Sequence, residues 1–191
     1  MPSEIPLLYS FLYDFIKKIP LIGNKTVILQ RKMKRPPLLP VVIGTGFGAG
    51  FWPWGPGTAG AVLATAIWLL LLGVMPLTAL MGLTFVLVVV FTALGTWATA
   101  RLTPFWGDDP SRVVVDEMVG VWIPLLLATE WHSALASLVL FRFFDIVKPL
   151  GIRQLDRRQG AFWVMADDIL AGIYSAIVLW VVMSVWPQFF I

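Results

Sequence analysis

The chain has 191 residues, 59% of them hydrophobic and 13% charged, and a formal net charge of +3. Ordinary soluble domains are about 45 to 50% apolar and about 25% charged, so this composition excludes a disordered chain and argues against a water-soluble globule. Cysteine is absent and His132 is the single histidine, which excludes disulfides, thiolate metal sites and catalysis by a pair of histidines. The small positive charge on so apolar a chain does not indicate nucleic acid binding.

The N-terminal 40 residues are predicted to lie outside the membrane core. Residues 1–22 place leucine and phenylalanine side chains along one face of a helix, which is typical of an amphipathic helix in the membrane interface. Residues 23–40 contain five basic residues and no acid, and this composition predicts a solvated basic segment. We therefore expect residues 1–40 to form an interfacial helix with a basic cytoplasmic segment, and residues 41–191 to form a single helical transmembrane domain that carries the site.

One interrupted segment and five apolar runs make up this second part. Residues 41–60 are rich in Gly, Pro and Trp and predict a structured re-entrant or interfacial loop. A helix that spans a bilayer needs about 20 mostly apolar residues. The runs near this length cover residues 58–75, 77–100, 113–129, 133–148 and 163–186. The predicted fold class is all-α: a polytopic helical membrane protein with about five transmembrane helices, an N-terminal interfacial helix and a Gly/Pro-rich loop.

The basic residues predict the orientation of these spans. If the N-terminus is cytoplasmic and the spans alternate, all 14 Lys and Arg residues fall in cytoplasmic segments or in the cytoplasmic half of the fourth span. Cytoplasmic loops carry an excess of Lys and Arg, so we expect the N-terminus on that side. Arg153, Arg157 and Arg158 in one of these loops could bind anionic lipid head groups.

Three of the five runs contain charges, which cost roughly 2.5 to 3.5 kcal/mol each at the centre of a bilayer. The charged residues are Asp116, Glu117, Arg142, Asp145, Lys148, Asp167 and Asp168. In the predicted topology all of them lie at one depth, near the cytoplasmic surface. They could be structural, because acids near helix N-termini interact favourably with the helix dipole and Arg142 or Lys148 could pair with Asp145. Alternatively, they form a functional site.

The net charge of this group favours a bound cation. Five carboxylates and two basic groups leave a charge of −3 in a partly dry region. Oxygen ligands without histidine or cysteine select a hard ion, Mg²⁺ first, with Mn²⁺ and Ca²⁺ as alternatives. Gly57 and Thr58, at the start of the first run, offer backbone N–H groups and a hydroxyl to an anion. Gly120 and Gly172, each four residues after one of the aspartates, are expected where two helices approach closely.

Four stretches carry these residues: GTGFGAGFWPWGPGTAGA, VVVDEMVGVW, FRFFDIVKPLGIRQLDRR and MADDILAGIYSA. In order and spacing they resemble the phosphatidylglycerophosphatase A family of bacterial membrane lipid phosphatases. The resemblance implies Mg²⁺-dependent hydrolysis of the terminal phosphate of phosphatidylglycerophosphate at the cytoplasmic face of the bacterial inner membrane. By this resemblance the family's acidic motifs fall on Asp116, Glu117, Asp145, Asp167 and Asp168, its basic motifs on Arg142 and Lys148, and its loop on Gly57 and Thr58.

The residues and the resemblance together give a hypothesis for the site. Asp116, Glu117, Asp167 and Asp168 hold Mg²⁺, and Arg142 and Lys148 bind phosphoryl oxygens. Asp145 activates the attacking water or orients the two bases, with an aspartyl-phosphate intermediate as an alternative. Other functions stay open: a carboxylate-lined transporter or ion channel, another lipid head-group enzyme, or a structural membrane subunit. The expected partners are phosphatidylglycerophosphate and anionic membrane lipid, with no nucleic acid.

Overall fold

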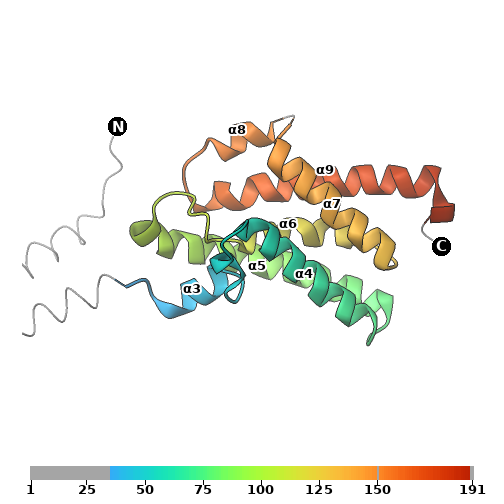
Figure 1. Ribbon diagram of the computed structural model, residues 1–191, viewed down its shortest axis with the longest axis horizontal. Helices are drawn as coiled ribbons and strands as arrows, with labels where there is room; N and C mark the ends of the chain where they lie inside the picture. Colours follow the sequence, from blue (N-terminus) through green and yellow to red (C-terminus); the bar gives the residue numbers. More distant parts are fainter. Residues whose placement is uncertain (1–34, 150, 190–191) are drawn as a thin grey trace, which may run out of the picture. The chain divides into compact units, whose positions relative to one another are not determined.

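A computed structural model describes residues 35–149 and 151–189 of the chain. This part is helical and contains no strand, which confirms the all-α class for it. The residues from Pro36 onward form one compact unit (Figure 1). The predicted interfacial helix and most of the basic segment lie outside the described residues. The α-helices and the two 3₁₀ helices, η1 and η2, are in chain order α3 (Leu38–Gly44), η1 (Ala49–Phe51), α4 (Pro56–Leu72), α5 (Leu77–Trp106), α6 (Val115–Leu125), α7 (Trp131–Val147), α8 (Ile152–Asp156), α9 (Ala161–Val185) and η2 (Pro187–Phe189).

Two of the described helices are long and apolar enough to cross a membrane. These are α5, with 30 residues, and α9, with 25 residues. The helices α4 and α7 have 17 residues each, and α6 has 11. At a rise of 1.5 Å per residue α6 is about 16 Å long, well short of the hydrocarbon core of about 30 Å. A helix occupies each of the five apolar runs, but the count of about five membrane spans is not confirmed.

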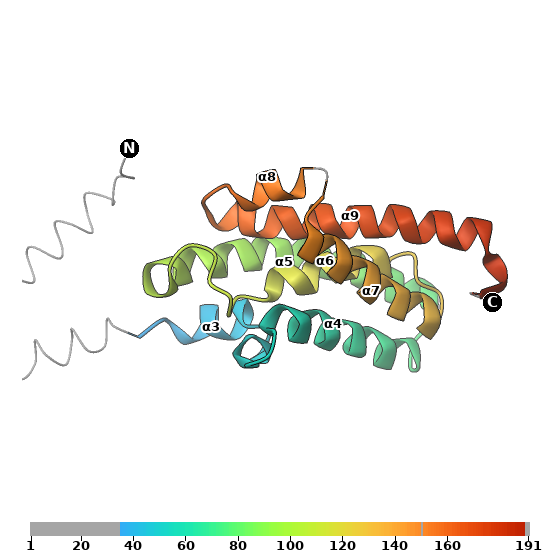
Figure 2. The ribbon, with the colours of Figure 1, turned by 45° about the horizontal axis from the view of Figure 1, so that its top comes forward.

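The helix α6 is a buried central element. It contacts α4, α5, α7 and α9 (Figures 1 and 2), and nine of its 11 residues are buried. The sequence predicted a helix over residues 113–129, whereas the helix ends at Leu125. Pro124 has no N–H to donate to the carbonyl of Gly120, so the hydrogen-bond ladder is interrupted in the last turn. Four helices pack around this short helix.

The segment predicted as an irregular loop, residues 41–60, is partly helical. The helix α3 ends at Gly44 inside it and contacts α5. This helix was missed because the Gly, Pro and Trp content of residues 41–60 was interpreted as too interrupted for a helix. Pro40 is compatible with α3 because a proline in the first turn of a helix needs no N–H. After α3, the hydroxyl of Thr45 donates to the carbonyl of Val41 at 2.7 Å and accepts from the N–H of Gly48 at 3.1 Å. These bonds hold the turn that leads to η1 and α4.

Candidate active site

A polar cavity of about 340 Å³ brings the charged motifs together. It lies at the N-terminal ends of α4, α6 and α9 and at the C-terminal end of α7. Seven carboxylates and three basic side chains line it. They are Asp109, Asp116, Glu117, Asp145, Asp156, Asp167 and Asp168 with Arg142, Lys148 and Arg158. Every charged residue that the sequence predicted for the site is therefore in one cavity, although these residues come from three helices.

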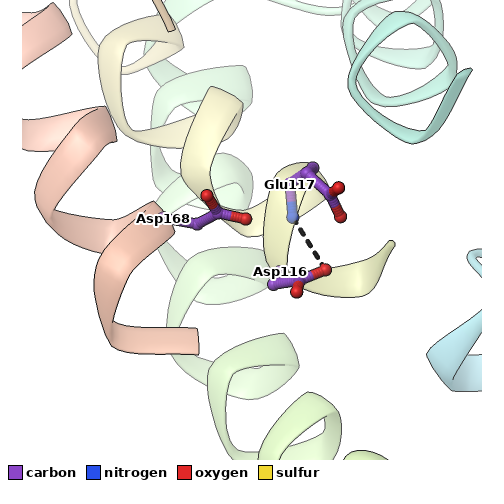
Figure 3. A group of neighbouring side chains, drawn as sticks. All are labelled: Asp116, Glu117 and Asp168. Carbon is purple, nitrogen blue, oxygen red and sulfur yellow. Dashed lines mark hydrogen bonds between the residues drawn. The ribbon is translucent and has the colours of Figure 1, made fainter. Parts of the chain in front are cut away.

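Three carboxylates form the buried centre of this cavity. Asp116 and Glu117 lie in the first turn of α6, where the helix dipole favours negative charge. Asp168 projects from the second turn of α9 toward them (Figure 3). The three side chains each offer one carboxylate oxygen, and these oxygens lie within 4.8 Å of one another. The Asp116 carboxylate also accepts a hydrogen bond of 3.1 Å from the N–H of Glu117.

Two glycines set the spacing between the helices that carry these carboxylates. A Cβ atom on Gly172 of α9 would overlap the backbone carbonyl oxygen of Gly120 on α6. A Cβ on Gly120 would overlap the ring of Phe141 and lie 2.9 Å from the carbonyl oxygen of Asp168. The close approach predicted for both glycines is confirmed. Because the backbones touch one turn from the acids, Asp168 is held against the first turn of α6.

Ion pairs hold two of the three basic side chains of the cavity, Arg142 and Lys148. Arg142 donates to the Asp145 carboxylate at 2.5 Å, one turn along α7. Lys148, at the C-terminal end of the same helix, donates to Asp167 at 2.8 Å and to Asp156. Burial alone would lower the pKa of Lys148, but its hydrogen bonds to Asp156 and Asp167 outweigh burial and raise it. Lys148 is therefore a fixed positive charge at neutral pH.

The carboxylate cluster fits a hard cation. Of the described side chains that line the cavity, none is His or Cys, and the donors in the cluster are all carboxylate oxygens, the ligands that Mg²⁺ prefers. One oxygen of Glu117, Oε2, is buried without a hydrogen-bond partner, and so is Nε of Arg142. Buried polar atoms are rarely left unsatisfied. These two atoms suit a site that binds a cation and an anion.

The structure separates two pairs of residues that the sequence treated together. Consecutive residues of a helix point about 100° apart. Asp168 thus faces α6, whereas Asp167 pairs with Lys148 and lies outside the group of three carboxylates. Similarly, Gly57 lines the cavity, but Thr58 is exposed and lines a neighbouring apolar groove. The Thr58 hydroxyl is therefore not part of the polar cavity.

Four polar residues of the lining were not predicted for the site from the sequence: Asp109, Ser111, Asp156 and Arg158. They lie in loops or in the short helix α8, where no periodicity marks a face. Asp109 has a positive φ of 49°, and burial raises the pKa of its carboxyl even though Lys148 opposes the shift. The Arg158 guanidinium lies 4.3 Å from the centre of the Trp163 ring. The cluster of acids and bases in residues 153–158 was the signal that could have indicated Asp156 and Arg158.

Comparison with known proteins assigns this chain to a family. The family model described as Phosphatidylglycerophosphatase A matches residues 42–183, a range that contains every residue predicted for the site. The chain is 34% identical to the Phosphatidylglycerophosphatase A of Escherichia coli, over 76% of this chain and 84% of that protein. The chain belongs to the phosphatidylglycerophosphatase A family. It is therefore an enzyme of the class that the family name denotes, a phosphoric monoester hydrolase.

Other relatives agree with the family but not all carry the same name. The Phosphatidylglycerophosphatase A of Haemophilus influenzae is 37% identical, over 74% of this chain and 86% of that protein. A protein of Bacteroides thetaiotaomicron named "Putative phosphatidylinositol-3-phosphatase" is 57% identical, over 77% of this chain and 95% of that protein. No solved structure is significantly similar to this chain. The family is shown by sequence, and the head group that this member prefers is a separate question.

Gly57 provides a first test of the site in this phosphatidylglycerophosphatase A family member. A Cβ at this position would overlap the Glu117 carboxylate and lie 3.3 Å from the Arg142 guanidinium. Both groups are the ends of flexible side chains, so we expect Gly57→Ala to displace them without unfolding the protein. A displacement of about 1 Å costs about 10²-fold in rate. Steady-state phosphate release and the Tm in detergent measure the two effects, and a variant with full activity would contradict this placement of Gly57.

The two partners of Lys148 should contribute unequally to stability. The Asp167 side chain is 8% exposed, whereas that of Asp156 is 32% exposed. We expect Asp156→Asn to lower the free energy of unfolding by less than about 1 kcal/mol, as for other solvated pairs. Asp167→Asn should cost more, because breaking a buried pair leaves a charge without its partner. Thermal unfolding of both variants in the same detergent checks this order, and equal losses would contradict it.

Proposed function

We propose that this chain hydrolyses the terminal phosphate of phosphatidylglycerophosphate, with Mg²⁺, at the cytoplasmic face of the membrane. The observation that supports this proposal is the single cavity in which Asp116, Glu117 and Asp168 lie beside Arg142 and Lys148. A phosphate monoester carries nearly two negative charges at neutral pH, which seven carboxylates would repel without a cation. The substrate agrees with the names of the relatives from E. coli and H. influenzae.

The residues that would hold Mg²⁺ are Asp116, Glu117 and Asp168. Asp167 was included by the sequence, but its ion pair with Lys148 gives it another role: it fixes the position of the Lys148 ammonium. When bound, the metal ion would neutralise charge on the phosphoryl oxygens and on the attacking water. The basic residues that line the same cavity, Arg142 and Lys148, would then contact the phosphate.

Arg142 and Lys148 would bind the phosphoryl oxygens. Arg142 can keep its bond to Asp145 through one guanidinium nitrogen and donate to phosphate through others, because it has five N–H groups. The backbone N–H of Gly57, in the first turn of α4, has no partner within the helix and adds a donor. Together these donors would orient the phosphorus atom for attack.

Asp145 would accept the proton of the attacking water. Its carboxylate accepts a hydrogen bond from Arg142 and lines the same cavity as Asp116, Glu117 and Asp168, so it lies in the cavity that would hold both the metal ion and the phosphate. The water oxygen would form a bond to phosphorus while the bond from phosphorus to the glycerol oxygen breaks, and the glycerol oxygen would take up the proton that Asp145 accepted from the water. The products are the lipid alcohol and inorganic phosphate.

The membrane placement follows from the apolar helices and the distribution of basic residues. The helices α5 and α9 are long and apolar enough to cross the bilayer, and all 14 basic residues fall on one side in the predicted topology. We propose a multi-pass protein of the bacterial inner membrane with its N-terminus and cavity facing the cytoplasm. Protease protection of tags at each loop in sealed vesicles tests this orientation.

A direct assay tests the function and the head group together. Purified full-length protein in detergent is given phosphatidylglycerophosphate, phosphatidylinositol 3-phosphate and phosphatidic acid, each with Mg²⁺ and with a chelator. We expect phosphate release from phosphatidylglycerophosphate to be the fastest and to stop when the metal is removed. Faster release from phosphatidylinositol 3-phosphate would instead assign the substrate named for the B. thetaiotaomicron relative. Release from none of the three lipids would contradict the proposal.

A further inference from the structure

An apolar groove of about 450 Å³ lies beside the polar cavity. One wall is the exposed side of α4, formed by Thr58, Val62 and Ala66, which are spaced four residues apart and so lie on one stripe of the helix. The other wall includes Trp52 and Trp54, whose rings meet edge to face with centroids 6.0 Å apart. No charged side chain is among the residues that line this groove.

The groove and the polar cavity share a wall. Gly55 lines both, Pro56 and Gly57 continue into the polar cavity, and Thr58 and Ala59 continue into the groove. The first turn of α4 therefore separates a region of fixed charges from a region without them. From Gly55 to Ala66 the axis of α4 rises about 16 Å, and beyond the groove Leu70, on the same stripe, is 74% exposed. The groove runs from the charged site along a helix that carries no charged residue.

We propose that this groove binds an acyl chain of the lipid substrate while the phosphate occupies the polar cavity. The inference rests on the proposed function and adds a second subsite to it. While the phosphate of a lipid lies in the polar cavity, its acyl chains must extend out of that cavity. The groove offers an apolar path for one of them, and this path begins at Gly55, which also lines the polar cavity. The Trp52 and Trp54 rings give this path an apolar wall that an acyl chain could contact.

The two tryptophans could serve another purpose. Tryptophans at membrane interfaces commonly anchor a protein without contacting a particular lipid. An anchor would support all lipid substrates equally, whereas a groove is sensitive to the length of the chain that it holds and to side chains that fill it. A hexanoyl chain is too short to reach Ala66 from Gly55, but an oleoyl chain is long enough. Chain length therefore distinguishes the two roles.

The test fills the far end of the groove with Ala66→Trp and compares two lipids with the same head group, dioleoyl and dihexanoyl phosphatidylglycerophosphate. We expect kcat/KM for the dioleoyl lipid to fall about tenfold or more, and for the dihexanoyl lipid to change less than about twofold. The matched control is Ala93→Trp, at an exposed alanine of α5 that lies outside the groove. A second variant, Ala59→Leu, places a larger side chain near the start of the groove and should reduce turnover of both lipids.

A binding measurement separates this inference from the proposed function. A phosphatidylglycerol with a diazirine at the end of its acyl chain should label residues 52–66 saturably, and unlabelled phosphatidylglycerol should compete. Ala66→Trp should reduce this labelling, and Ala93→Trp should not. Saturable labelling without hydrolysis of any lipid would support acyl-chain binding in the groove and overturn the proposed function. If Ala66→Trp lowered hydrolysis equally for both chain lengths, or did not lower it, the groove would not be an acyl-chain site. Cross-linking of residues 52–66 to a second copy of the chain would also contradict the proposal.

Discussion

The Asp168→Asn variant is expected to release phosphate about 10²- to 10³-fold more slowly than the wild type, the usual cost of removing one electrostatic contact in an active site. Asp168 is 4% exposed and is the member of the carboxylate cluster that α9 supplies. Asparagine keeps the shape of the side chain but removes its charge and one metal-binding oxygen. The measurement is kcat at saturating Mg²⁺ with phosphatidylglycerophosphate in mixed micelles.

A stability measurement distinguishes loss of metal binding from loss of fold in this variant. In chelator we expect Asp168→Asn to be at least as stable as the wild type, because three buried carboxylates repel one another without a cation. Mg²⁺ should then raise the Tm of the wild type more than that of the variant, since a ligand stabilises only the state that binds it. Asp108→Asn is the matched control, because Asp108 is exposed and lies outside the lining of the cavity. Equal Mg²⁺ responses of Asp168→Asn and the wild type would remove Asp168 from the metal site.

The carboxylates could be found from sequence because charge is rare in this chain. Only 13% of the residues are charged, so each acid in an apolar run needs a physical explanation. One shared site explains all of them only if the runs place the acids at the same end of their helices. This argument requires the direction of each helix and no knowledge of its packing. The structure places Asp116, Asp145 and Asp168 together, as expected from alternating helices.

Side-chain direction and helix length depended on packing that the sequence does not specify. The sequence assigned Asp167 and Asp168 one role, but Lys148, which takes a left-handed conformation at the end of α7, pairs with Asp167 and not with Asp168. Likewise, the apolar run that contains α6 predicted a membrane span, and the structure shows an 11-residue helix that contacts four other helices. Hydropathy alone does not separate burial in protein from burial in lipid.

The Gly172→Ala variant is expected to lower the free energy of unfolding by about 1 to 3 kcal/mol, as overpacking does in other cores. The added methyl group meets the backbone carbonyl of Gly120, which cannot rotate away as a side chain can, so α9 must move from α6. Asp168, one turn before Gly172, moves with it and leaves Asp116 and Glu117. Stability and the rise in Tm caused by Mg²⁺ should therefore decrease together, with about 2 to 4 °C of Tm lost per kcal/mol for a chain of this size.

Gly82→Ala is the control for the general effect of replacing a helical glycine. Gly82 lies inside α5, and a Cβ there would meet no atom within 4 Å, so alanine should stabilise the helix slightly because it loses less backbone entropy on folding. Phosphate release should be unchanged in this variant and reduced in Gly172→Ala. If Gly172→Ala kept the Tm, the Mg²⁺ response and the activity of the wild type, contact between the α6 and α9 backbones would not be what positions the three carboxylates. If it lost stability but kept the full Mg²⁺ response, the metal site would tolerate movement between the two helices.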